Sequence, residues 1–138
     1  MRRTLFLIAS IMAATPSFAI ATDRTAMVLD KCVGDPANSS TGGQTTCETQ
    51  AARSYDHRLN IAYQGLLKML PPAAAQQLRQ AQRTWLAFRA ADAEARSALY
   101  GTRQGTMYVP MQAHAETIAV RDRALQLEAD LRVMQIEP

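Results

Sequence analysis

Aromatic and metal-binding side chains are scarce in this chain of 138 residues. Aromatic residues make up 6% of it, with one tryptophan, so a core must be built mostly from Leu, Ala, Met and Ile. The two histidines, His57 and His114, lack the His-Glu-x-x-His spacing of a zinc hydrolase. Two cysteines without a nearby pair of histidines fill too few positions for zinc. The composition therefore predicts no metal centre and no cofactor.

Local motifs for catalysis are missing as well. Each histidine has an acidic residue within two positions, but such neighbours are common on solvated helix surfaces. Asp92 and Glu94 are close in sequence, yet a spacing of two turns their side chains to different sides of a helix. Without a nucleophile, a metal or a carboxylate pair, the sequence predicts a protein that is not an enzyme.

The first 21 residues have the pattern of a secretory signal peptide. Two arginines precede an apolar run over 5–14, which Pro16 ends. Small-residue cleavage sites follow, and we expect release after Ala21, with Ala19 as the alternative. An uncleaved anchor would need roughly 20 apolar residues, and no cysteine follows either site to carry a lipid. We therefore expect a periplasmic or secreted protein, a single helical domain over 22–138 with no stable membrane insertion.

The mature chain has no excess of charge of one sign. The full sequence holds 15 Lys and Arg against 12 Asp and Glu, and two arginines leave with the signal peptide, so 13 face 12 and the net charge is +1. Interspersed charges near neutrality are not typical of a nucleic-acid surface. No nucleic-acid partner is expected.

The two cysteines, Cys32 and Cys47, are expected to form a disulfide in an oxidising compartment. A metal site and a reactive thiol are the weaker alternatives. The segment 33–46 between them is rich in Gly, Ser, Thr, Asn and Pro, which is typical of turns and loops. The bond would tether this N-terminal loop to the body of the domain, at a gain of about 3 kcal/mol for a loop of this size.

Apolar residues at helical spacing predict three main helices, over 47–69, 72–100 and 111–134, after a short one over 25–29. Pro71 and Pro72 separate the first two, and a glycine-containing connection over 100–110 separates the last two. Their apolar stripes are Tyr55, Leu59, Ala62, Leu66 and Met69; Leu78, Ala81, Trp85, Phe88, Ala95 and Leu99; and Thr117, Val120, Ala124, Leu127, Leu131 and Met134. The pattern predicts an all-α fold, a small antiparallel bundle.

An ordered set of residues resembles one family of exported bacterial proteins. After Cys47 comes Asp-x-x-Leu-Asn-x-x-Tyr, followed by the segment Gln-Arg-Thr-Trp-Leu-Ala-Phe-Arg and an arginine in the last helix. Together these are similar to the LprI-like lysozyme-inhibitor domain, over nearly the whole mature chain. The residues that carry the resemblance are Tyr55, Asp56, Leu59, Asn60, Tyr63, Gln82, Arg83, Trp85, Arg89 and Arg121. We interpret them as structural.

This chain departs from the family where many members place a second disulfide. The family's cysteine after the tryptophan segment is Ala93 here, and its partner on the last helix falls at Ala113 or Ala115. The family's acidic residue after its arginine is Ala90. The second and third main helices must therefore be held together by packing alone.

Trp85 and Arg89 are one helical turn apart, so the guanidinium can lie against the indole ring. The pair could be a recognition patch, but we favour a core anchor with an arginine that reaches towards solvent. Asn60 is likewise expected to serve the structure, by a bond to a neighbouring helix or a loop.

The resemblance implies a protein partner, a lysozyme, whose cleft this domain would cover by non-covalent binding. Recognition concentrates on loops, so Asp35, Thr102 and Gln104 are the candidate contacts. The alternative is a general envelope module that binds another protein without inhibiting a lysozyme, because a shared fold does not determine function.

Overall fold

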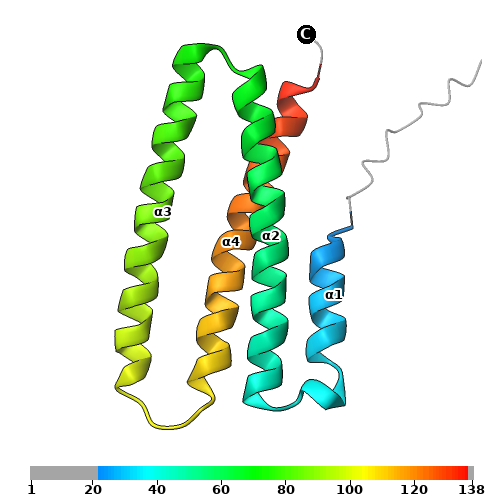
Figure 1. Ribbon diagram of the computed structural model, residues 1–138, viewed down its shortest axis with the longest axis vertical. Helices are drawn as coiled ribbons and strands as arrows, with labels where there is room; N and C mark the ends of the chain where they lie inside the picture. Colours follow the sequence, from blue (N-terminus) through cyan, green and yellow to red (C-terminus); the bar gives the residue numbers. More distant parts are fainter. Residues whose placement is uncertain (1–21, 137–138) are drawn as a thin grey trace, which may run out of the picture.

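The computed structural model describes residues 22–136, and all of the regular secondary structure in that range is helical, which confirms the predicted all-α class (Figure 1). The proposed signal peptide, 1–21, lies outside the described residues. Residues 22–136 form four α-helices rather than three main ones, and a short 3₁₀ turn. They are α1 (Arg24–Val33), η1 (Pro36–Asn38), α2 (Thr41–Met69), α3 (Pro72–Gly101) and α4 (Tyr108–Met134). None of these helices has the length and hydrophobicity of a membrane span.

Helices that follow one another in the sequence run antiparallel, yet the main packing joins α2 and α4, which run in the same direction (Figure 1). α1 lies along one side of α2, and α3 returns along the other side of the pair. Gly65 lets the two core helices approach closely, because a Cβ there would lie 3.0 Å from Leu131 Cδ2. The structure is therefore a two-helix core flanked by α1 and α3.

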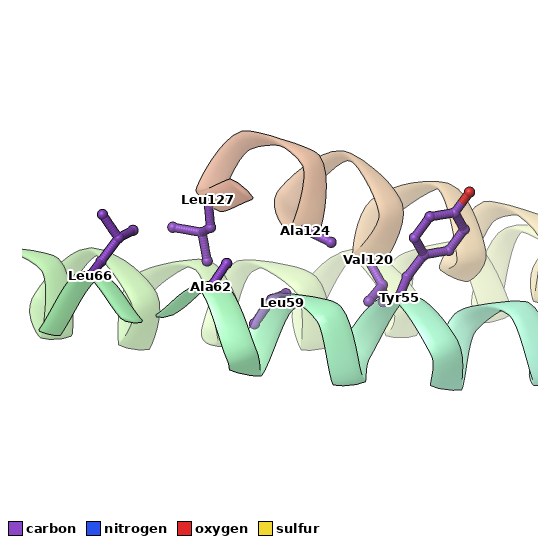
Figure 2. Packing of buried hydrophobic residues seen from close by; sticks show 7 residues of the cluster. All are labelled: Tyr55, Leu59, Ala62, Leu66, Val120, Ala124 and Leu127. Carbon is purple, nitrogen blue, oxygen red and sulfur yellow. The ribbon is translucent and has the colours of Figure 1, made fainter. Parts of the chain in front are cut away.

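The main cluster of buried apolar residues comes entirely from α2 and α4 (Figure 2). The predicted stripes of these helices are confirmed over most of their length, because their members recur every three or four residues on the facing sides. Only the C-terminal members differ: Met69 and Met134 are exposed. The core residues are Tyr55, Leu59, Ala62, Leu66, Val120, Ala124 and Leu127.

The predicted seam of α3 is confirmed only at Leu78 and Trp85, which pack against the core, and is wrong at its other members. Phe88 is 67% exposed and Leu99 is 60% exposed, and α3 buries only Ala75 and Gln82 fully. The stripe that faces the core pair runs through Leu78, Gln82, Trp85, Arg89, Asp92 and Arg96. The C-terminal half of this stripe is charged, and Arg89 in it forms an ion pair with Glu116 of α4. Apolar periodicity misplaces this seam because the charged residues Arg89, Asp92 and Arg96 occupy the C-terminal half of the stripe.

The segment between the cysteines is more ordered than the composition predicts. α2 begins at Thr41, six residues before the predicted start, because Ser40 Oγ accepts a hydrogen bond from Gly43 N at 3.0 Å and caps the helix. A Cβ on Gly43 would lie 2.7 Å from Asn38 Cα and from Asn38 O, so only glycine fits where η1 passes over the first turn of α2.

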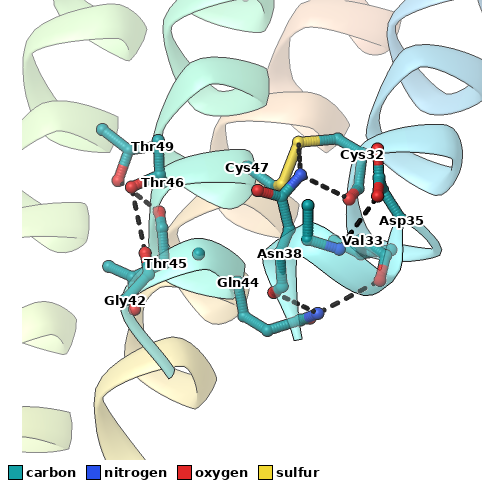
Figure 3. Close-up of a disulfide and its surroundings, with 12 residues drawn as sticks. Cys32, Val33, Asp35, Asn38, Gly42, Gln44, Thr45, Thr46, Cys47 and Thr49 are labelled. Atoms are coloured by element: carbon teal, nitrogen blue, oxygen red, sulfur yellow. Dashed lines mark hydrogen bonds between the residues drawn. A yellow bond between two sulfur atoms is a disulfide. The ribbon is translucent and has the colours of Figure 1, made fainter. Parts of the chain in front are cut away.

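The predicted disulfide between Cys32 and Cys47 is confirmed (Figure 3). It joins α1 to α2, so what it tethers is a helix and a 3₁₀ turn rather than a loop. Gln44 reinforces the same junction, because its Nε2 donates to Val33 O and to Asn38 O, both at 3.1 Å. The whole connection is therefore held against α2 by one covalent bond and by main-chain acceptors.

Arg58 links α1 to both core helices. Its Nε and Nη2 donate to the two carboxylate oxygens of Glu128 on α4, at 2.7 and 2.8 Å, and its Nη1 donates to Asp23 Oδ1 at 2.6 Å. Asp23 also caps α1 and accepts a hydrogen bond from Tyr55 OH at 2.8 Å. Burial alone would raise the pKa of Asp23, but the hydrogen bonds from Tyr55 and Arg58 outweigh it, and the pKa is lowered.

Candidate functional site

Both inter-helix connections that carry candidate contacts lie at one end of the molecule (Figure 1). One is 34–40 between α1 and α2, and the other is 102–107 between α3 and α4. We call this the loop end. Its sequence-predicted contacts are Asp35, Thr102 and Gln104, all exposed. The fold therefore brings Asp35 to the same end of the molecule as Thr102 and Gln104, which lie far from it in sequence.

Two of these three side chains also stabilise the connections themselves. The carboxylate of Asp35 accepts a hydrogen bond from Ala37 N at 2.9 Å and caps η1. Thr102 Oγ1 donates to Leu99 O at 2.7 Å and closes α3. Gly105 has φ of 111°, a left-handed conformation that glycine adopts readily, and turns the chain towards α4. The loop end is thus built with defined local geometry.

A cavity of about 380 Å³ opens at the loop end between α2, the end of α3 and the start of α4. Its walls combine apolar, aromatic and titratable side chains, which is the composition of many ligand sites. The lining residues are Gln44, Glu48, Tyr100, Pro110, Met111, His114 and Ala115. Gln44 also bonds to Val33 and Asn38, so one wall of this cavity is joined to the α1–α2 connection.

Glu48 is an unusual residue in the wall of this cavity, because it is acidic and yet only 7% exposed. Its Oε1 lies 2.9 Å from Nδ1 of His114 on α4, and its Oε2 has no hydrogen-bond partner among residues 22–136. Its main-chain oxygen accepts a hydrogen bond from Thr117 Oγ1 at 3.0 Å. A buried acceptor that lacks a donor costs about 1–3 kcal/mol, more if charged.

Apolar and aromatic residues flank the α3–α4 connection, and Tyr100 and Met111 among them line the cavity. The rings of Tyr100 and Tyr108 stack with centroids 5.5 Å apart, across the α3–α4 connection. Leu99, Met107, Val109 and Met111 are all exposed. Exposed apolar residues that lie close together mark an interaction surface more often than hydrophilic residues do.

Most residues of the family motif surround a different hollow, of about 270 Å³, between α2 and α3. They largely bond to one another or to neighbours: Asn60 Nδ2 donates to Asp56 O at 2.8 Å, and Gln82 Oε1 accepts a hydrogen bond from Arg123 Nε at 3.0 Å. Asn60 thus bonds within its own helix, rather than to a neighbouring helix or a loop. The motif residues that line this hollow are Asp56, Leu59, Asn60, Tyr63, Gln82, Arg83 and Trp85.

Trp85 is half-buried at the centre of that junction and packs against the core. The guanidinium carbons of Arg89 and Arg123 lie 5.5 and 5.9 Å from its ring centroid. Burial lowers the pKa of the Arg123 guanidinium. The motif therefore fastens α3 to the core pair. Its remaining members are Tyr55 in the core and Arg121, which bonds to Asp122 on its own helix.

The structure brings together the positions where the resemblance places a second disulfide. Ala93, Ala113 and Ala115 line one cavity of about 290 Å³ between α3 and α4. No free cysteine is present among the described residues, and the ion pair of Arg89 with Glu116 spans this gap. Small side chains and one ion pair thus stand where other members would carry a covalent bridge.

Two further features bear on chemistry. A groove of about 500 Å³ runs between α1 and α2, beside the disulfide, and it is larger than the loop-end cavity. Its lining residues include no buried polar side-chain atom that lacks a hydrogen-bond partner. His57 is exposed on α2 and makes no hydrogen bond within residues 22–136, so only His114 has a structured acidic partner. No cluster of three metal-ligating side chains occurs in the described part of the chain.

A disulfide-bonded helical protein with a cavity at its loop end is the class that these observations define. A family model described as lysozyme inhibitor LprI matches residues 32–127, so the chain belongs to the LprI family. The chain is also similar to a crystal structure of an uncharacterized protein from Burkholderia thailandensis, with 33% identity and a TM-score of 0.76 over 83% of this chain. It spans 56% of that protein's length. A comparison with curated proteins found no match.

Proposed function

We propose that this protein is exported and inhibits a lysozyme by covering its cleft with the loop end. Three observations support this proposal: membership of the LprI family, the exposed apolar residues beside the α3–α4 connection, and the loop-end cavity. The placement of both connections at the same end of the molecule as this cavity carries the proposal, because it supplies a surface that can enter a concave partner. Binding is non-covalent, with no turnover by the chain itself.

The inhibition test uses the mature chain, starting at Thr22, with a lysozyme in a cell-wall lysis assay. Inhibition is expected to saturate near equal molar amounts when binding is tight. Met107→Ser combined with Val109→Ser should weaken inhibition about tenfold, because apolar anchors dominate interface energy. Phe88→Ser is the matched control: it removes an equally exposed apolar side chain from α3, away from the loop end.

Two results would contradict this reading. If excess protein leaves the lysozyme active at low and moderate salt, the inhibitor function fails for that enzyme, and the general envelope module becomes the better account. If the Phe88 variant loses as much inhibition as the loop-end variant, the binding surface lies elsewhere.

Export has its own test. Mass spectrometry of protein taken from the periplasm or medium should find a chain that begins at Thr22. An intact Met1 would show that the N-terminal segment is not removed.

A further inference from the structure

The Glu48–His114 pair places a buried carboxylate in the cavity wall, where a positively charged group can pair with it. Glu48 is buried with one oxygen unpartnered among residues 22–136, while its other oxygen is covered by His114 Nδ1. The His114 side chain is 58% exposed, so it can turn away from the cavity without disrupting the core. A ligand with several donors that displaced His114 would reach the carboxylate.

The remaining walls favour the same kind of ligand. The Nε2 of Gln44 is bound to two main-chain carbonyls, which leaves its amide oxygen as an acceptor. The ring of Tyr100, stacked on Tyr108, offers an aromatic surface on which a planar cation is attracted. Acceptors and an aromatic ring together match a guanidinium, which carries five donors and stacks on aromatic faces.

We propose that this cavity is a socket for an arginine side chain of the protein that binds the loop end. The inference rests on the proposed function for the identity of the partner, a lysozyme with a basic rim, but the socket itself depends only on the cavity. The guanidinium would pair with the Glu48 carboxylate, displace the His114 ring and lie against Tyr100. Its stem would follow Pro110 and Met111 to the mouth.

The first experiment titrates the mature chain with Nα-acetyl-argininamide and, separately, with its neutral counterpart Nα-acetyl-citrullinamide. NMR signals of the His114 and Tyr100 rings report binding. The arginine compound should shift both sets of signals, and the citrulline compound should bind at least about tenfold more weakly, because it lacks the charge. Equal binding of the two compounds would overturn the socket, and this comparison needs no variant.

The second experiment measures variants against the same compound and against lysozyme. Glu48→Gln should weaken both at least about tenfold, whereas Glu94→Gln, the same change at an exposed site on α3, should have no effect. His114→Ala should bind the arginine compound at least as tightly as the original chain, because it uncovers Oε1. If both cavity variants lose affinity equally, the pair serves only the structure and the socket is wrong.

The two proposals fail separately. Inhibition that survives Glu48→Gln unchanged would leave the proposed function standing without the socket. Specific binding of the arginine compound by a chain that leaves lysozyme untouched would leave the socket standing without the proposed function.

Discussion

Replacing Gly43 by alanine should destabilise the protein, whereas replacing the adjacent Gly42 should not. A Cβ at Gly43 would lie 2.7 Å from Asn38 Cα and O, while one at Gly42 would meet nothing closer than Ser40 Oγ at 3.9 Å. Both glycines stand in the first turn of α2. Replacing either one by alanine brings the same gain in helix propensity, up to about 1 kcal/mol. The difference between the two variants therefore isolates the steric penalty at Gly43.

That penalty should be about 3 kcal/mol, the upper end for inserting one methyl group into a packed site, because the obstacle is backbone rather than a flexible side chain. The Gln44 bond to Asn38 O would shift with it. Urea denaturation of both oxidised variants, followed by far-UV circular dichroism, measures the difference. Equal stability of the two variants would refute the close approach of η1 to α2, and with it the geometry of the loop end.

Three further outcomes are expected. Trp85→Ala should cost about 2–4 kcal/mol, because the side chain is half-buried, and should free α3 first; hydrogen exchange that accelerates equally in α2 would contradict this. Cys32→Ala and Cys47→Ala should each cost about 3 kcal/mol, since each opens the same loop, and unequal losses in urea would count against a purely covalent role. Because the pKa of Asp23 is lowered in the fold, its contribution should be complete above about pH 4 and be lost as pH falls through the lowered value; Arg58→Ala should flatten that part of the acid unfolding profile.

The sequence predicted the buried stripes of α2 and α4 well, because these helices bury apolar residues at regular spacing, but it did not predict that the two helices pair. The stripe from Tyr55 to Leu66 is a direct reading of that spacing. α3 was misread because Phe88 and Leu99 are exposed while Arg89 and Asp92 face inward. Amphipathic periodicity locates the inward face of a helix that packs through apolar side chains. It does not locate the inward face of a helix that forms ion pairs there.

The start of α2 and the cavity were beyond sequence reasoning for a different reason. Gly42 and Gly43 read as loop, and only the Ser40 cap and the contact with η1 make that turn helical. For His114, the acidic residue nearest in sequence is Glu116, two positions away, and we interpret that spacing as a chance feature of the helix surface. The actual acidic partner is Glu48, 66 positions earlier, and no short-range signal encodes that pairing.

The parallel packing of α2 and α4 determines when this protein can fold. The bonds that join the two helices link residues 66 to 70 positions apart, from Glu48 with His114 to Arg58 with Glu128. During synthesis, which starts at the N-terminus, all of α3 must be made before the apolar stripe of α2 can pack against α4. Until the final helix arrives, that stripe stays open to water and to other chains, so folding is slow for so helical a protein and depends on the last quarter of the sequence.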